Sequence, residues 1–547
     1  MVSATHWLAA ASGMRMLERG GNAFDAAAAA GFVLQIVEPH QNGPGGDLPV
    51  VFWSAEVGAP RVLCAQGPAP AAATLERYAG LDLVPGEGVL AAVVPGAFDG
   101  WMQLVRDFGT LRLGEILEPA IGYAAEGFPV VRELAAEVAA HAERFRAEWP
   151  SSAEVWLRDG GPRDVYTLPG VAATYRRIVD EAAGRDREAE FDAARDVFYR
   201  GFVADAIDGF GSLVRGDDLA RWSASYEDPV VFDYGGLTVC KPGPWSQGPV
   251  FLQQLALLSG FDLSAMTAVE RLHTLIECGK LAFADREAWY GDPEFVDVPM
   301  DALLSREYAD ERRVLVGDDA SSELRPGSPD GREPQLATPV HGAPVAPGIG
   351  EPTRGDTVHL DVVDRWGNMV AATPSGGWFW GAPVVPELGF CLGTRAQMFW
   401  LEEGLPNSLE PGKRPRTTLS PTLVARDGDP YLALGTPGGD QQDQWTLHTF
   451  LAHVHFGLDL QAAIDAPGHH TEAFPSSFYP RATRERHVAV EERVGDATVD
   501  GLRARGHDVE VSPQWSVGRV SAVARETDGQ LKAGASPRGM QGYAAGR

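Results

Sequence analysis

The stretch from 355 to 373 constrains the fold of this 547-residue chain more than any other. Apolar residues alternate from Val358 to Val362, which is the period of a half-buried strand. A turn-forming cluster, Asp-Arg-Trp-Gly-Asn, follows at 364–368, and a second apolar run occupies 369–373. The pattern predicts an antiparallel β-hairpin whose first strand starts near position 357.

The register of this hairpin predicts which side chains meet at its open end. If Asp364 faces Asn368, equal counting along the two strands places Thr357 opposite Ser375. A threonine hydroxyl is a weak nucleophile until a base takes its proton, and a chain cut between Asp356 and Thr357 supplies that base. The new α-amino group, with an ordinary pKa of roughly 7.7 to 8.0, belongs to the same residue. Taken alone, the pattern is more typical of a plain strand start than of a cleavage site. The choice between the two therefore depends on the rest of the chain.

Further motifs follow one another along almost the whole sequence. They occupy 19–27, 38–40, 43–46, 278–286, 291–293, 412–415, 420–422, 435–439 and 534–538. In this order, and with Thr357 between them, the motifs resemble the γ-glutamyltransferase family of N-terminal-nucleophile hydrolases from about residue 3 to the C-terminus. Segment 19–27 is similar to the opening helix of that family, and 43–46 to the glycine turn after it.

The resemblance implies an α/β fold of the αββα type, a four-layer sandwich made as an inactive precursor. Thr357 is then expected to attack the peptide bond after Asp356, giving a large subunit, 1–356, and a small subunit, 357–547, interleaved in one domain. Independently of the resemblance, 321–354 is rich in proline, glycine and polar residues, which predicts an exposed loop before the cut.

The resemblance also assigns roles around the nucleophile. Ser375 matches a hydroxyl that hydrogen-bonds the nucleophilic oxygen, although a turn serine is the simpler interpretation. Gly438 and Gly439 match a pair whose backbone N–H groups form an oxyanion hole, and a plain Pro-Gly-Gly turn has the same sequence. Thr417 and Thr418 replace two serines that contact the substrate carboxylate.

Several positions depart from the family pattern where it binds the amino-acid head of the substrate. Leu75 takes the place of an arginine that clamps the carboxylate, and Met398 that of an aspartate that holds the ammonium group. Gly377 replaces an asparagine. Arg395 offers a new guanidinium that can bind a carboxylate in bidentate fashion, or can be a purely structural arginine.

Two further features of the same region are open to more than one interpretation. The aromatic residues Trp378, Trp380, Phe399 and Trp400 suggest a pocket with aromatic walls, although four such residues are more often core. The polar run 440–443, directly after the glycine pair, departs from the family without an evident reason.

The leading functional hypothesis is a self-processing amidohydrolase or acyltransferase that forms an acyl-enzyme at Thr357 and transfers a γ-glutamyl or related acyl group mainly to water. An alternative keeps the chemistry but changes the substrate to an acyl amide without an α-amino acid head, such as a dicarboxylate monoamide or an acylated β-lactam. A third hypothesis is an unprocessed, non-catalytic binding protein.

Composition excludes several other classes of function. The formal net charge of −29 argues against binding to nucleic acid or to an anionic membrane surface. No apolar run reaches the roughly 18 to 20 residues that span a bilayer, and no signal peptide is evident, so we expect a cytoplasmic protein. The four cysteines are far apart and no HExxH motif occurs, so we expect neither metal nor cofactor. The partners expected are a small-molecule substrate and the second subunit from the same precursor.

Overall fold

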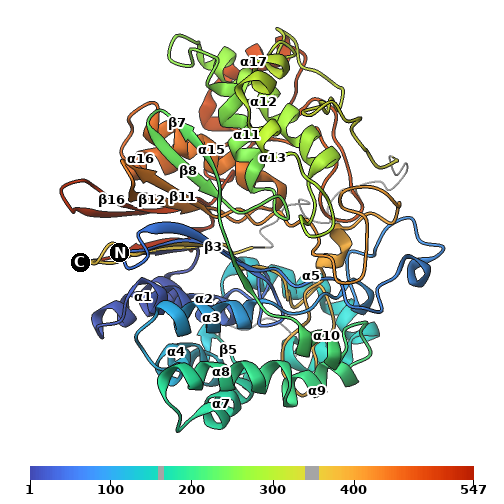
Figure 1. Ribbon diagram of the computed structural model, residues 1–547, viewed down its shortest axis with the longest axis vertical. Coiled ribbons are helices and arrows are strands. Elements are labelled where there is room, and N and C mark those ends of the chain that lie inside the picture. The colour runs from blue at the N-terminus through green and yellow to red at the C-terminus, as the bar shows by residue number, and fades with distance from the viewer. Residues whose placement is uncertain (158–164, 339–356) are drawn as a thin grey trace.

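The computed structural model describes residues 1–157, 165–338 and 357–547. Two antiparallel sheets form its centre, and they pack face to face with helices on both outer sides (Figure 1). The first sheet has the strand order β18 (Tyr543–Ala545), β1 (Val2–Ala4), β9 (Leu360–Val363), β10 (Met369–Ala372), β2 (Leu48–Ser54), β3 (Ala59–Ala65) and β6 (Ser225–Glu227). The second has the order β17 (Leu531–Ala535), β16 (Ser521–Arg525), β12 (Asp429–Gly435), β11 (Thr422–Arg426), β8 (Leu237–Lys241) and β7 (Val230–Tyr234).

The helices divide between the two outer faces. Those on the side of the first sheet are α1 (Trp7–Glu18), α2 (Ala23–Val37), α3 (Ala97–Phe108), α4 (Leu113–Glu126), α5 (Arg132–Glu148), α6 (Pro150–Trp156), α7 (Pro169–Ala182), α8 (Arg187–Tyr199), α9 (Phe202–Gly209) and α10 (Gly216–Arg221). Those on the side of the second sheet are α11 (Gly248–Leu258), α12 (Ala268–Trp289), α13 (Met300–Leu303), α14 (Arg306–Arg313), α15 (Gln442–Val454), α16 (Leu460–Asp465) and α17 (Asp496–Ala504).

Smaller elements complete the described chain. A three-stranded sheet joins β13 (His469–Thr471), β14 (His487–Glu491) and β15 (Asp508–Ser512), and β4 (Phe128–Pro129) pairs with β5 (Val165–Tyr166). Short 3-10 turns are η1 (Leu75–Tyr78), η2 (Val89–Ala91), η4 (Arg395–Met398), η5 (Gly439–Gln441), η6 (Glu492–Val494) and η7 (Arg538–Met540). In the described part of the chain, no helix is both long and apolar enough to cross a membrane.

Helix α2 shows why the first sheet is well anchored. Every residue of α2 is buried, as expected for a helix that is apolar on all sides, and it packs against β9 and β10. Its start corrects the prediction of a helix over 19–27, because the helix begins only at Ala23. Gly20 adopts a φ of 95°, which ends α1, and Asn22 then caps α2 in a capping box with Asp25.

The predicted hairpin register is confirmed. Met369 pairs with Val363 and Ala372 with Leu360, and the Asp364 N–H donates to the Asn368 carbonyl at 3.1 Å. The regular strand is shorter than predicted, since it begins at Leu360. Thr357 and Ser375 nevertheless remain paired through an isolated bridge beyond the strand end.

Both central sheets contain strands from before and after position 357. In the first sheet β1, β2, β3 and β6 come from the preceding part, whereas in the second only β7 and β8 do. The predicted cleavage position, Asp356, lies outside the described residues, as does the rest of 339–356. The described part of the predicted loop, 321–338, contains no helix or strand and is largely exposed.

The four cysteines are buried free thiols, which agrees with their interpretation as small core residues. Cys64 and Cys240 lie in the apolar layer between the two sheets. Burial raises the pKa of both thiols to about 12, so neither is ionised near neutral pH.

Glu38 makes the stability of the fold depend on pH. Its side chain is fully buried and accepts a hydrogen bond from the Thr5 hydroxyl at 2.7 Å. Burial raises the pKa of Glu38 from 4.5 to about 7, although Arg519 opposes the shift. A raised carboxyl pKa means that the folded state holds its proton more tightly than the unfolded state does. The contribution of protonated Glu38 to the free energy of unfolding is therefore complete below about pH 4.5, and it is lost as the pH rises through 7.

We therefore expect Glu38→Gln, which cannot ionise, to lose less stability than the wild type between pH 5 and pH 8. The difference in unfolding free energy between the two proteins should change by about 2.5 kcal/mol over that range, in favour of the variant at high pH. Denaturant unfolding at both pH values measures it, with the exposed Glu56→Gln as control. A difference that stays constant with pH would contradict the shifted pKa.

Candidate active site

Thr357 and Ser375 form the centre of the candidate site. Their hydroxyl oxygens lie 3.1 Å apart, within hydrogen-bond distance, and both side chains are buried. Asp47 flanks the pair on the next strand, because its N–H donates to the Ser375 carbonyl and its carbonyl accepts from the Ser375 N–H. The pairing of two hydroxyls predicted from the register is therefore present.

The glycine turn 43–46 packs directly on the segment after Ser375. A Cβ on Gly46 would lie 2.0 Å from the Ser375 carbonyl oxygen, so only glycine fits there. Gly377 has a φ of 66°, and a Cβ at this position would lie 3.0 Å from the Gly46 nitrogen. Gly377 therefore provides close backbone approach, and it has no side chain with which to replace the asparagine of the family.

Arg395 is held beside this pair by a carboxylate that the sequence analysis did not identify. Its Nε donates to Asp47 Oδ2 at 3.0 Å, and both side chains are buried. Burial raises the pKa of Asp47, and the neighbouring guanidinium opposes that shift. No local pattern links residues 348 positions apart, so only the unusual acidic residue after the glycine turn could have drawn attention to Asp47.

Aromatic side chains cover the guanidinium. Trp378 lies 5.0 Å and Phe478 6.0 Å from the Arg395 carbon Cζ, and both rings pack with Met398 in one cluster. The predicted aromatic wall is thus only partly correct. Trp380 stacks on Trp378 with ring centroids 5.0 Å apart, but the other two predicted rings pack elsewhere.

Those two rings, Phe399 and Trp400, belong to separate apolar clusters. Phe399 packs with Ala396 in the cluster that also receives Leu75. The positions expected to hold the two charges of an amino-acid head are therefore apolar in the folded protein, since Met398 is also fully buried among aromatic rings.

The glycine pair, Gly438 and Gly439, packs against the rings of Trp445 and Phe478. Gly438 has a φ of 124°, and a Cβ there would lie 2.1 Å from the Trp445 ring. Gly439 has a φ of 55°, and its Cβ would lie 2.9 Å from the Phe478 ring that also faces Arg395. Both positions therefore require glycine for conformation and for space.

His359, two residues after Thr357, packs against the strand that leads to the glycine pair. A Cβ on Gly435, at the end of β12, would lie 2.3 Å from the His359 ring, so the strand leading to the glycine pair packs against the strand of Thr357. Contacts thus run from Thr357 through Ser375, Asp47 and Arg395 to Phe478, and from this ring to Gly439. They return to the strand that follows Thr357 through the contact between Gly435 and His359.

His359 belongs to a buried polar chain that the sequence analysis missed. Its Nδ1 lies 2.8 Å from Thr373 Oγ1 and its Nε2 2.9 Å from Asp361 Oδ1, while the Ser521 hydroxyl donates to Asp361 Oδ2 at 2.8 Å. The strand period places His359 and Asp361 on the same face as Thr357. The sequence alone shows this alternation, because the polar residues 357, 359 and 361 occupy every second position between the apolar ones.

Thr417, one of the two threonines predicted to contact substrate, is linked to the glycine pair through Gln247. The Gln247 N–H donates to the Thr417 carbonyl at 2.8 Å, and its amide Nε2 donates to the Gly439 carbonyl at 3.4 Å. Thr418 is fully buried, and its hydroxyl has no hydrogen-bond partner.

The unexplained polar run 440–443 is structural. Asp440 pairs with Arg286 and accepts from the Ser477 hydroxyl at 2.6 Å, and Asp443 pairs with Lys241 at 2.9 Å. Although burial alone would raise it, these contacts hold the pKa of Asp440 below its ordinary value. The run fixes the turn that carries Gly438 and Gly439.

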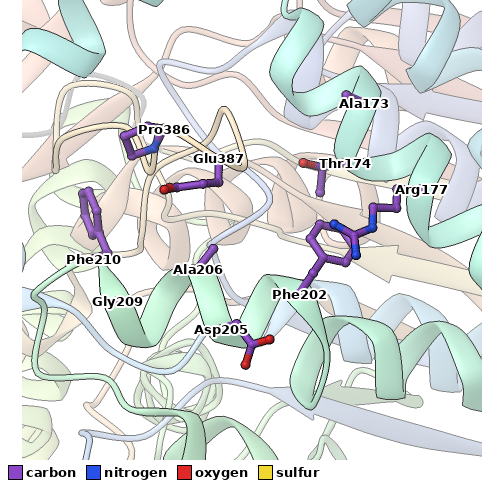
Figure 2. A pocket seen from close by; sticks show the side chains of 10 residues that line it. All are labelled: Ala173, Thr174, Arg177, Phe202, Asp205, Ala206, Gly209, Phe210, Pro386 and Glu387. Carbon is purple, nitrogen blue, oxygen red and sulfur yellow. The ribbon is translucent and has the colours of Figure 1, made fainter.

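Two other features of the described chain do not join this site. His273, Glu277 and His507 bring ligand atoms within 4.8 Å of one another, but Glu277 is already paired with a lysine and an arginine. A surface hollow of about 740 Å³ lies between α7, α9 and Pro386–Glu387 (Figure 2). None of its lining residues belongs to the candidate site.

Comparisons with known proteins find relatives over almost the whole chain. A sequence model described as gamma-glutamyltranspeptidase matches residues 9–546. The "Glutathione hydrolase-like YwrD proenzyme" of Bacillus subtilis (strain 168) is 32% identical, over 98% of this chain and 97% of its own. The solved structure of LmbA2991HD is 54% identical with a TM-score of 0.95, over 100% and 98% of the two chains. The cephalosporin acylase from Bacillus halodurans is 32% identical with a TM-score of 0.86, over 100% and 95%.

Proposed function

The chain belongs to the γ-glutamyltranspeptidase family, and we propose that it is a self-processing amidohydrolase whose nucleophile is Thr357. The observation that carries the proposal is the 3.1 Å contact between the hydroxyls of Thr357 and Ser375, at the ends of two central strands and beside a glycine turn. Relatives of this chain are proenzymes, which supports a precursor that is cut. The layering in Figure 1 supports an αββα sandwich of the N-terminal-nucleophile type.

Processing begins when Thr357 Oγ1 attacks the carbonyl carbon of Asp356. The peptide C–N bond breaks as the ester bond forms, and the nitrogen takes the proton and becomes the α-amino group of Thr357. Water then hydrolyses the ester, which frees the Thr357 hydroxyl and leaves 1–356 and 357–547 as two chains within one domain. Ser375 orients the attacking oxygen through their hydrogen bond.

Substrate turnover repeats the same chemistry with an external amide. The α-amino group accepts the hydroxyl proton, Thr357 Oγ1 bonds to the acyl carbon, and the proton passes to the leaving amine as the C–N bond breaks. N–H groups of Gly438 and Gly439 stabilise the negative oxygen of the tetrahedral intermediate. Water finally cleaves the acyl-enzyme, giving a carboxylic acid and restoring the hydroxyl.

The substrate class follows from the departures around Arg395. γ-Glutamyl compounds are the default of the family, but Met398 and Leu75 leave no charged partner for an α-amino acid head at their positions. These apolar contacts favour the alternative, an acyl amide without that head, and the similarity to a cephalosporin acylase supports it. Thr417, Thr418 and Gly377 would then line the acyl pocket without recognising an amino acid.

Intact mass of the purified wild-type chain, incubated near neutral pH, tests the proposal. We expect two fragments, 1–356 and 357–547, with Thr357 as the first residue of the smaller one. N-terminal sequencing identifies that residue. A chain that remains uncut would instead support the non-catalytic binding protein.

A further inference from the structure

We propose that Arg395, positioned by Asp47, binds a carboxylate carried by the acyl group of the substrate. This inference rests on the proposed function and names the acyl donor class: monoamides of dicarboxylic acids. The evidence is the state of the Arg395 side chain, which is fully buried and carries both Nη1 and Nη2 without hydrogen-bond partners. Among the arginines that the structure describes, no other has both terminal nitrogens buried and unpartnered.

A buried guanidinium normally satisfies most of its donors. Arg286 shows the usual pattern, since its three nitrogens donate to two carboxylates, an amide oxygen and a backbone carbonyl. Each buried donor left unpaired costs on the order of 1 to 3 kcal/mol, and more when the group is charged. A structural role for Arg395 does not repay this cost, because Asp47 takes only the Nε proton.

The geometry of the guanidinium suits a second carboxylate. Its five N–H donors form a planar fork, so one edge can bind Asp47 while the two terminal nitrogens bind another carboxylate in bidentate fashion. Trp378 and Phe478 lie beside the fork, at 5.0 and 6.0 Å from Cζ, and exclude water from it. A carboxylate bound in these surroundings is held more strongly than one at the surface.

The fork also lies close enough to serve the nucleophile. Asp47, Ser375 and Thr357 are successive partners across the sheet, and neighbouring residues of such a row are about 5 Å apart. Arg395 and the Gly439 turn both lie beside the same Phe478 ring. An acyl group that binds at Arg395 therefore reaches Thr357 with its other carbonyl.

The test compares 4-nitroanilides of oxalate, succinate and glutarate with neutral acyl anilides of matched length and with the γ-glutamyl anilide. For the wild type we expect at least one carboxylated substrate to have a kcat/KM about 100-fold above that of its neutral partner. Arg395→Gln should reduce this preference to less than about tenfold, mainly through KM, while the chain still cuts itself. The exposed Arg306→Gln is the matched control and should keep the preference.

Calorimetry with free oxalate, succinate and glutarate adds a measurement that does not depend on turnover. The processed wild type should bind one of them and Arg395→Gln should not. The double variant Asp47→Asn with Arg395→Gln removes both charges of the pair, so its equal loss of binding would exclude an effect of an unpaired buried Asp47. A processed wild type that hydrolyses neutral or γ-glutamyl anilides equally well and binds no dicarboxylate would overturn the inference but leave the proposed function intact. An uncut wild type would instead count against the proposed function.

Discussion

Thr357→Ala should leave the chain uncut and reduce hydrolysis of any amide by at least about 10⁴-fold. Alanine removes the hydroxyl that performs both the self-cleavage and the attack on substrate, and no neighbouring group can replace it. Ser375 offers a hydroxyl 3.1 Å from Thr357 Oγ1, but it has no α-amino group of its own to act as base. Intact mass and the rate of anilide hydrolysis measure the two effects on the same sample.

Thr357→Ser is the matched control for this substitution. Serine keeps the hydroxyl and, after cleavage, the α-amino group, so it should cut itself and turn over substrate at a reduced but measurable rate. Ser375→Ala removes only the partner of the nucleophile and should slow both reactions without abolishing them. Cleavage before position 357 in the alanine variant would show that another group, or a contaminating protease, cuts the chain.

The pairing of Thr357 with Ser375 was predictable because the positions of both residues depend on local rules. A strand alternates with period 2 and a short turn fixes the register, so Thr357 and Ser375 could be paired from the sequence between them. The same rules failed at the strand's start, since the ladder becomes regular only at Leu360. Beyond the regular ladder, the glycine turn 43–46 packs against the segment after Ser375. No local sequence rule predicts this packing.

Of the charged pair in the site, the sequence indicated Arg395 but not Asp47. Arg395 stood out as an arginine at an unusual position, but its partner Asp47 lies on another strand, and its apolar cover includes Phe478 from an irregular segment. Pairing of this kind depends on tertiary packing, which periodicity does not encode. The role of the polar run 440–443 likewise depends on the distant Arg286 and Lys241, with which Asp440 and Asp443 pair.

Gly438→Ala should lower kcat by at least about 100-fold and slow self-cleavage by a similar factor. The new Cβ would lie 2.1 Å from the Trp445 ring at a φ of 124°, so the turn must move and its N–H groups leave the position of the oxyanion. Binding of substrate precedes the formation of that oxyanion, and KM should change little. Self-cleavage passes through the same kind of tetrahedral intermediate, which is why both rates fall together.

Gly428→Ala separates this effect from the general cost of a side chain at positive φ. Gly428 has a φ of 85° in the turn between β11 and β12, and nothing lies within 4 Å of a Cβ built there. That variant should lose about 1 kcal/mol of stability while it keeps wild-type rates of cleavage and hydrolysis. If Gly438→Ala also kept those rates, with its fold intact by circular dichroism, the glycine pair would be a plain turn and the oxyanion donors would have to lie elsewhere.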